Sequence, residues 1–242
     1  KDSIAAPNTV LNTIVAEAFS EACDVLEKAD DFDLAVHDLI KTYLTEHQRI
    51  IFNGNGYSEE WVEEAARRGL PNIKSMVDAI PALTTDKAVA LFEKFQVFTK
   101  AELESRAEIQ YEIYAKAINI EAKTMVDMAT KQIIPAVIKY TTVLAESINQ
   151  VKAVGPIDVS VQMDLLKKAS KLLKEVNSTM NKLSKLVDQI ETHPEGRDRA
   201  VFCREKLVPA MEKLREPVDE LEMLVDKDMW PMPSYGDLIF EV

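Results

Sequence analysis

The apolar residues in the first fifty positions follow a helical spacing. They recur every three or four residues, which places them on one face of an α-helix. We predict one helix that starts at Pro7 and Asn8, then a break at a short acidic run, and a second helix from about Asp33 to Ile51. The apolar positions are Leu11, Ile14, Val15, Ala18, Ala22, Val25 and Ala29, then Leu34, Ile40, Leu44, Ile50 and Ile51.

A patch of short helices is predicted next, in residues 54–98. The run Asn53-Gly54-Asn55-Gly56 predicts a turn with positive φ angles. Ser58 is typical of a helix N-cap, and the helix that it starts should end at Gly69. Two further short helices are expected at Asn72–Ile80, ended by Pro81, and at about Thr85–Phe95.

The segment from Thr99 to about residue 153 has the strongest helical pattern. Thr99 and Glu102 form a capping-box signature, and no glycine follows until Gly155. The apolar stripe repeats every eleven residues, the period of a nearly straight helix roughly 80 Å long, and Pro135 predicts a kink. The stripe consists of Leu103, Ala107, Tyr111, Tyr114, Ile118, Ala122, Met125, Ala129, Ile133, Ala136, Tyr140, Leu144, Ile148 and Val151.

Two later segments carry a seven-residue apolar repeat, which is typical of helices packed along a seam. The short connection His193-Pro194-Glu195-Gly196 between them predicts antiparallel neighbours. Together with the long helix they should form an elongated antiparallel three-helix bundle. The seams are Leu165, Ala169, Leu172, Val176, Thr179, Leu183, Leu186 and Ile190, then Leu207, Met211, Leu214, Val218, Leu221 and Val225.

The predicted fold class is therefore all-α, with short helices packed beside the long-helix bundle and an extended C-terminal tail. We expect three regions: the small helices in 1–98, the bundle in 99–226 and the tail in 227–242. Two prolines and a glycine in Met229–Asp237 argue against helix there. The apolar and aromatic tail should dock, either on the body of the chain or on a neighbouring subunit.

Composition and charge exclude several classes of function. The chain carries 29 basic and 41 acidic residues, a net charge of −12, which would repel a nucleic-acid backbone. The absence of a long apolar run or a signal sequence argues against membrane insertion and export, and two distant cysteines fit the cytoplasm. Because the first residue is Lys1 and not methionine, we expect the sequence to be a piece of a longer protein.

Motifs that would carry chemistry are absent, so we assign no catalytic, cofactor-binding or metal-binding residue. Gly54-Asn55-Gly56 resembles the start of a dinucleotide fingerprint, but the third glycine is missing and the segment follows a helix. Structural roles explain the three histidines, the acidic runs at helix starts, the methionines on apolar faces and a solvated lysine face more simply. These residues are His37, His47 and His193; Asp30, Asp31, Asp33, Glu59, Glu60, Glu63 and Glu64; Met125, Met128, Met180 and Met211; and Lys167, Lys168, Lys171 and Lys174.

Several segments together resemble one family, the C-terminal third of type III glutamine synthetases. The likeness covers almost the whole chain and is weakest in residues 150–200; Lys1 and Ala6 depart from the usual residues of the family. The segments that carry the resemblance are Asp2–Asn12, Arg49–Ser58, Leu70–Asn72, Phe98–Arg106 and Trp230–Asp237.

The resemblance implies a function for the parent enzyme and a lesser role for this chain. The parent would make glutamine from glutamate and ammonia, using ATP and Mg²⁺ or Mn²⁺. Its metal ligands, substrate-binding arginines and nucleotide loop would lie upstream of this sequence. Residues 1–98 would continue the end of the catalytic domain, and the bundle would contact other subunits or help to assemble a ring.

One alternative stays open, a free-standing helical scaffold that binds a partner protein through the bundle face or the tail. The sequence also leaves open an effector site in the bundle, the order of subunits, and whether the segment Asn53–Ser58 faces ligand, subunit or solvent.

Overall fold

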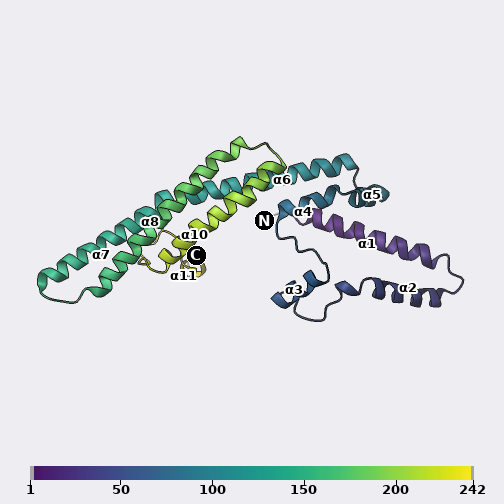
Figure 1. Ribbon diagram of the computed structural model, residues 1–242, viewed down its shortest axis with the longest axis horizontal. Helices are drawn as coiled ribbons and strands as arrows, with labels where there is room; N and C mark the ends of the chain where they lie inside the picture. Colours follow the sequence, from purple (N-terminus) through teal and green to yellow (C-terminus); the bar gives the residue numbers. More distant parts are fainter. Residues whose placement is uncertain (1–2, 241–242) are drawn as a thin grey trace. The chain divides into compact units, whose positions relative to one another are not determined.

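The computed structural model describes residues 3–240, and every regular element in that range is helical (Figure 1). This confirms the all-α fold class. No helix in these residues is long and apolar enough to cross a membrane. The chain divides into two compact units, 1–108 and 109–242. Because the division falls inside a continuous helix, it differs from the boundary at 98/99 that the sequence pattern favours.

The first unit is built from short and medium helices. Helix α1 packs against α2 and α5, and a 3-10 turn at Ile80–Thr84 packs against α4 and α5. The helices of this unit are α1 (Ala5–Leu26), α2 (Phe32–Glu46), a 3-10 turn (Gln48–Ile50), α3 (Glu59–Arg67), α4 (Met76–Ala79), the 3-10 turn Ile80–Thr84, α5 (Asp86–Lys94) and the first part of α6 (Lys100–Met128).

Side-chain caps start most of these helices where the sequence places them. The Ser58 hydroxyl accepts from the backbone N–H of Trp61, and the Thr85 hydroxyl accepts from that of Ala88. At α6 the Glu102 carboxylate accepts from the Thr99 backbone N–H at 2.8 Å, which confirms the capping box. Local sequence therefore determines where α3, α5 and α6 begin.

Three local predictions in this unit are wrong. Helix α1 begins at Ala5, so Asn8 lies inside the helix and not at its start. Residues 72–75 are not helical, because α4 begins after its cap Ser75. Pro81 is the second residue of the 3-10 turn that starts at Ile80, where its missing N–H is not needed.

The third error concerns the Asn53–Gly56 run. Neither Gly54 nor Gly56 adopts the left-handed conformation with positive φ that the run predicts. Gly54 is needed for space instead, because a Cβ there would lie 2.5 Å from the Phe52 ring. Gly69 does adopt a positive φ of 70°, and the Leu70 N–H bonds back to the carbonyl of Ala65, so the predicted stop of α3 is confirmed.

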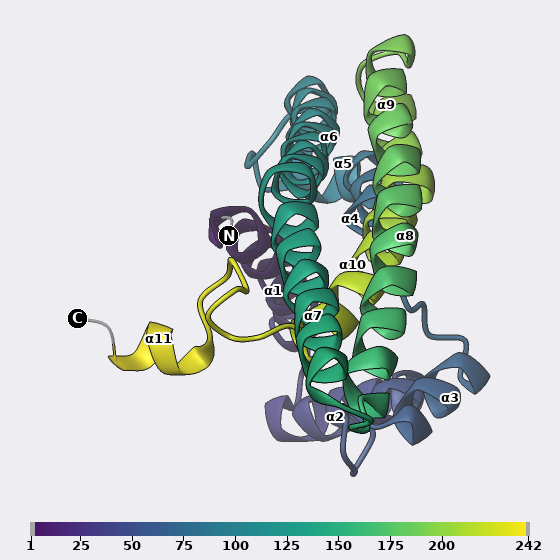
Figure 2. The same ribbon diagram turned by 90° about the vertical axis from the view of Figure 1, so that its left-hand side faces the viewer.

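The second unit contains the long helices (Figure 2). Helix α8 packs against both α7 and α10. The elements are the rest of α6, a π turn (Ala129–Ile133), α7 (Ile134–Val154), α8 (Ser160–Gln189), a 3-10 turn (Ile190–Thr192), α9 (Arg197–Phe202), a π turn (Cys203–Leu207), α10 (Val208–Glu222) and α11 (Tyr235–Phe240).

One continuous hydrophobic core holds this unit together. Every residue of the eleven-residue stripe and of the two seven-residue seams is buried or half-buried, and all of them except Leu103 and Ala107 lie in this unit. Ala122, Leu183 and Leu221, from α6, α8 and α10, are among the fully buried members of the cluster. The heptad and eleven-residue patterns thus mark the core faces correctly, while an elongated antiparallel three-helix bundle stays a prediction.

Two prolines in the long helices each follow a π turn, and the helical path continues through both. Pro135 and Pro209 each occupy the second position of a helix that follows a five-residue π turn. In a π turn each backbone N–H donates to the carbonyl oxygen five residues earlier, as the Ile134 N–H does to Ala129. The proline, which has no N–H, comes directly after this hydrogen bond. The discontinuity expected at Pro135 is therefore a π turn.

The tail is only partly extended. Met229, Trp230 and Met232 pack against the core of their own unit, but Tyr235–Phe240 form α11 at the end of a loop that leads away from α10 (Figure 2). The prediction that proline and glycine exclude helix fails here. The Asp237 carboxylate accepts from the backbone N–H and hydroxyl of Ser234, both at 2.7 Å, and this capping box starts the helix.

Candidate functional site: uncovered apolar surfaces

Helices α1 and α2 carry large apolar side chains that stay exposed among the described residues, although the two helices contact each other. Thr13 is the sole fully buried residue of α1, and α2 has none. Phe19 is 68% exposed, although it lies on a helix with the spacing of a core element. We call this surface the α1/α2 face; it comprises Leu11, Ile14, Val15, Phe19, Val25, Leu34, Ile40 and Leu44.

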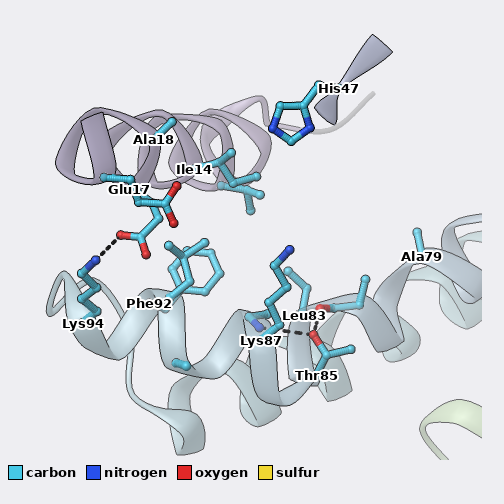
Figure 3. A pocket seen from close by; sticks show the side chains of 16 residues that line it. Ile14, Glu17, Ala18, His47, Ala79, Leu83, Thr85, Lys87, Phe92 and Lys94 are labelled. Atoms are coloured by element: carbon cyan, nitrogen blue, oxygen red, sulfur yellow. Dashed lines mark hydrogen bonds and ion pairs between the residues drawn. The ribbon is translucent and has the colours of Figure 1, made fainter. Parts of the chain in front are cut away.

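A groove runs between α1 and α5, with a volume of about 840 Å³ (Figure 3). Ile14 and Ala18 line it from α1, and Phe92 and Leu83 line it from the opposite side. Phe92 is buried, because the aromatic ring of Phe98 packs against it with ring centroids 5.5 Å apart. The walls of this α1/α5 groove are therefore mainly aliphatic and aromatic carbon.

Charged groups lie along the edge of the α1/α5 groove. The Lys94 ammonium donates to the Glu17 carboxylate at 2.5 Å, linking α5 to α1 (Figure 3). This hydrogen bond, with the charge of Glu17, raises the pKa of Lys94 against the opposing effect of desolvation. Glu21, His47 and Lys87 also line the groove. The ion pair joins the two helices beside the apolar walls.

The α1/α5 groove is suited to docking an apolar segment. The Thr85 hydroxyl, which lines it, is already used as the N-cap of α5. Among residues 3–240, no three His, Cys, Asp or Glu side chains come together in a group that could hold a metal ion. The prediction that the chain contributes no catalytic, cofactor or metal residue stays a prediction.

Several of the residues weighed as chemical candidates make structural contacts, and others are exposed. His193 stacks on Phe202 with ring centroids 4.0 Å apart, and His37 is exposed beside Asp38. In the acidic runs, Asp31 caps α2, and Glu64 pairs with both Arg67 and Arg68. Met180 is buried in the core of the second unit. The lysine face of α8 is exposed, as expected of a solvated flank.

A second uncovered surface lies at the C-terminal end. Tyr235, Leu238, Ile239 and Phe240 of α11 are exposed, and we call them the α11 patch. Hydrogen bonds from Ser234, and then one from Lys227, lower the pKa of Asp237 to about 2. The charged carboxylate thus keeps α11 capped and tied to Lys227 while its apolar side chains stay free.

Sequence reasoning found the helices of these surfaces but missed the surfaces themselves. The apolar spacing of α1 and α2 predicts a face that packs against other residues. It cannot show whether those residues lie in the same unit. Pro209, two residues after Leu207, repeats the spacing of Pro135 after Ile133, so the second π turn had a readable signal. The α11 cap was also readable, as Ser234 and Asp237 three residues apart.

Comparison with known proteins gives a consistent family. Residues 35–152 match the model of the glutamine synthetase C-terminal domain. The chain is 35% identical to a glutamine synthetase from Butyrivibrio fibrisolvens over 88% of its length, and 32% identical to a type-3 glutamine synthetase from Dictyostelium discoideum over 97%. A glutamine synthetase from Bacteroides fragilis is 30% identical over 89%.

These matches cover 31%, 33% and 30% of the three relatives, so the chain spans about a third of their length. The match of the family model begins within α2 and ends within α7, so it includes parts of both units. Both the family model and the three relatives carry the same family name. The chain therefore belongs to the glutamine synthetase family, as the region of its C-terminal domain.

Proposed function

We propose that this chain is the C-terminal helical region of a type III glutamine synthetase and serves contact within and between subunits. In this proposal the α1/α2 face and the α1/α5 groove dock against the catalytic part of the enzyme, and the α11 patch docks against another subunit. The observation that carries the proposal is the α1/α2 face, which has core-like spacing and remains exposed.

The energetics of burial support a cover for this face. A large aliphatic or aromatic side chain gains about 1.5 to 3 kcal/mol when it moves from water into a packed interior. The α1/α2 face contains eight such side chains, and soluble monomers rarely expose so many together. The relatives are about three times longer than the matched region, so the proposed cover is the remaining two thirds of such an enzyme.

The chemistry of the parent enzyme belongs to that remaining part in our proposal. It would ligate ammonia to glutamate with ATP and Mg²⁺ or Mn²⁺ in the cytoplasm. The described residues offer no converging group of metal ligands, so we assign the metal, the nucleotide and both substrates to the region outside this chain. This chain alone should then be inactive.

The direct test changes the two surfaces in a glutamine synthetase that contains this chain. Phe19→Asp should disturb the fit of α1 to the catalytic part, and Phe240→Asp should weaken contact between subunits, because each places a charge in an apolar interface. Size-exclusion chromatography with light scattering would measure the assembled mass. Tyr57→Asp, at a fully exposed side chain outside these surfaces, is the matched control.

Assembly that is unchanged in both Phe19→Asp and Phe240→Asp would refute the contact role. A separate measurement addresses the division of labour: the purified 242-residue chain should show neither γ-glutamyl transfer nor ATP turnover. Either activity in the isolated chain would overturn the assignment of the catalytic residues to the rest of the enzyme.

A further inference from the structure

A pocket in the first unit differs in charge from the rest of this acidic protein. It lies between the end of α2, the connection that follows and the last turn of α3, and its volume is about 670 Å³. None of its lining residues is acidic, whereas the α1/α5 groove includes Glu17 and Glu21. The Arg49 pocket, as we call it, is lined by Leu44, Gln48, Arg49, Ile51, Asn53 and Arg68.

Arg68 fixes the backbone that forms one side of the Arg49 pocket. Its Nη1 donates to the carbonyl oxygens of Arg49 at 3.2 Å and Ile51 at 2.7 Å. Its Nε donates to the Glu64 carboxylate at 2.5 Å, which anchors the guanidinium on α3. The segment that carries Arg49 is therefore held to a helix by hydrogen bonds to a charged donor, the stronger kind.

Aromatic stacking also holds the same segment to α3. The rings of Phe52 and Trp61 stack with centroids 4.3 Å apart, and the Arg68 guanidinium lies 5.7 Å from the centroid of Trp61. The Phe52 ring also lies against Gly54, where any larger residue would displace it. A pocket whose wall is fixed in advance loses little conformational entropy when a ligand binds.

The charges around the Arg49 pocket do not balance. Glu64 is shared by Arg67 and Arg68, so one carboxylate faces two guanidinium groups. The Arg49 guanidinium has no hydrogen bond or ion pair within residues 3–240, and the side-chain amides of Gln48 and Asn53 offer further donors. Glu59 and Glu60 are exposed in the first turn of α3 and do not line the pocket.

We propose that the Arg49 pocket binds an oxyanion, the phosphate or carboxylate group of a small molecule. The Arg49 guanidinium provides a planar pair of N–H donors, the geometry that suits both groups. Gln48 and Asn53 supply neutral donors beside it, and Leu44 and Ile51 provide apolar contact for the rest of the ligand. This site shares Leu44 with the α1/α2 face, but its proposed anion contacts come from Arg49, Gln48 and Asn53 and do not depend on the proposed function.

Calorimetric titration of the 242-residue chain tests the site with two probes, inorganic phosphate and acetate, at constant ionic strength. Saturable binding of phosphate alone identifies a phosphate group as the ligand, and binding of acetate alone identifies a carboxylate. Arg49→Ala should weaken binding about tenfold or more, because it removes a charged donor pair. Arg49→Lys should keep part of the affinity.

Arg67→Ala is the matched control. It also removes one guanidinium charge from the first unit, but Arg67 pairs with Glu64 and does not line the pocket, so the affinity for the probe should stay within about twofold of the original. Far-UV circular dichroism confirms that each variant is folded. The proposal is overturned if neither probe binds at concentrations up to about 10 mM, or if Arg67→Ala and Arg49→Ala weaken binding equally.

Discussion

The two units of this protein have helices of similar amphipathic pattern and treat their apolar faces in opposite ways. In the second unit, residues of the α6 and α7 stripe such as Ala122 and Tyr140 meet the seams of α8 and α10 in one core, in which Leu183 is fully buried. In the first unit the apolar faces of α1 and α2 remain exposed. The amphipathic pattern thus predicts that an apolar face will be buried, and the helices of the second unit bury theirs against each other, whereas α1 and α2 do not.

The difference explains which unit can be stable by itself. Burial of apolar side chains is the main favourable contribution to folding, and the second unit gains it internally. The first unit depends more on local signals, including caps, chain reversals and the Glu17–Lys94 ion pair. The predictions that follow test this contrast, beginning with the largest effect.

The two cysteines provide one probe for each unit. Cys23 is exposed on α1, whereas Cys203 is fully buried in the π turn before α10, where desolvation raises the pKa of its thiol. We expect a thiol reagent to label Cys23 at least about a thousandfold faster, since Cys203 needs an opening that costs about 4 kcal/mol. Cys23→Ser and Cys203→Ser identify the two phases. Similar rates would show that the core of the second unit opens readily.

Truncation of leucine should have unequal costs in the two units. Leu183→Ala should lower the free energy of unfolding by about 2 to 5 kcal/mol, because it leaves a cavity in the core. The matched change Leu11→Ala, at a leucine that is 59% exposed, should cost less than about 0.5 kcal/mol. Urea denaturation followed by circular dichroism measures both. Equal costs would mean that the α1/α2 face is covered in the isolated chain.

At two helix ends in the first unit, loss of a glycine should lower the stability and gain of a glycine should raise it. Gly69 has a φ of 70°, and Gln96 has a φ of 53° at the equivalent position after α5. Gly69→Ala should destabilise by about 1 kcal/mol through backbone strain, since a Cβ there meets no other atom within 4 Å. Gln96→Gly should stabilise by about 0.5 to 1 kcal/mol. Thermal unfolding reports both, and a stabilising Gly69→Ala would contradict the backbone argument.

The smallest expected effect is the acid sensitivity of two capping boxes, one in each unit. Hydrogen bonds from Thr99 lower the pKa of Glu102, and those from Ser234 lower the pKa of Asp237 to about 2. Folding lowers the pKa of both carboxyl groups. The stabilisation of the folded state by each cap is therefore complete above the unfolded pKa of about 4 and is lost as pH falls through the folded pKa.

Nuclear magnetic resonance of the backbone amides of Ser234 and Thr99 follows the two caps during an acid titration. We expect the Ser234 amide to shift with a midpoint near pH 2 and to lose this response in Asp237→Asn. The corresponding control for α6 is Glu102→Gln. A midpoint at the ordinary pKa of aspartate would show that the α11 cap does not form.

Much of the fold follows from short-range rules in the sequence. Ser58, Thr85 and the pair Thr99–Glu102 place helix starts correctly, since a cap acts within three or four residues of itself. The errors at Asn8 and in residues 72–75 concern helix starts, which lie three residues earlier and four residues later than the pattern predicts. The error at Gly54 arises where a neighbouring contact outweighs propensity. The Phe52 ring, for example, requires glycine at 54 for space, and no φ rule contains that contact.

The candidate surfaces were less accessible to sequence reasoning. The groove joins Ile14 to Phe92, and the Arg49 pocket joins Arg49 to Arg68, so each depends on residues that are distant along the chain. The resemblance to glutamine synthetases came from short segments, and the family is confirmed by the matches to known relatives. That sequence resemblance does not indicate which helix faces stay exposed.

The sequence by itself determined the all-α class, the caps, the core faces of the long helices and the family. The class, caps and core faces depend on residues within one or two helical turns of each other, and the family depends on the similarity of short sequence segments. Only the tertiary structure decided that the apolar side chains of α1 and α2 stay exposed and that Arg49 and Arg68 share a pocket. The physical reason is that coverage and charge balance depend on which side chains meet across helices.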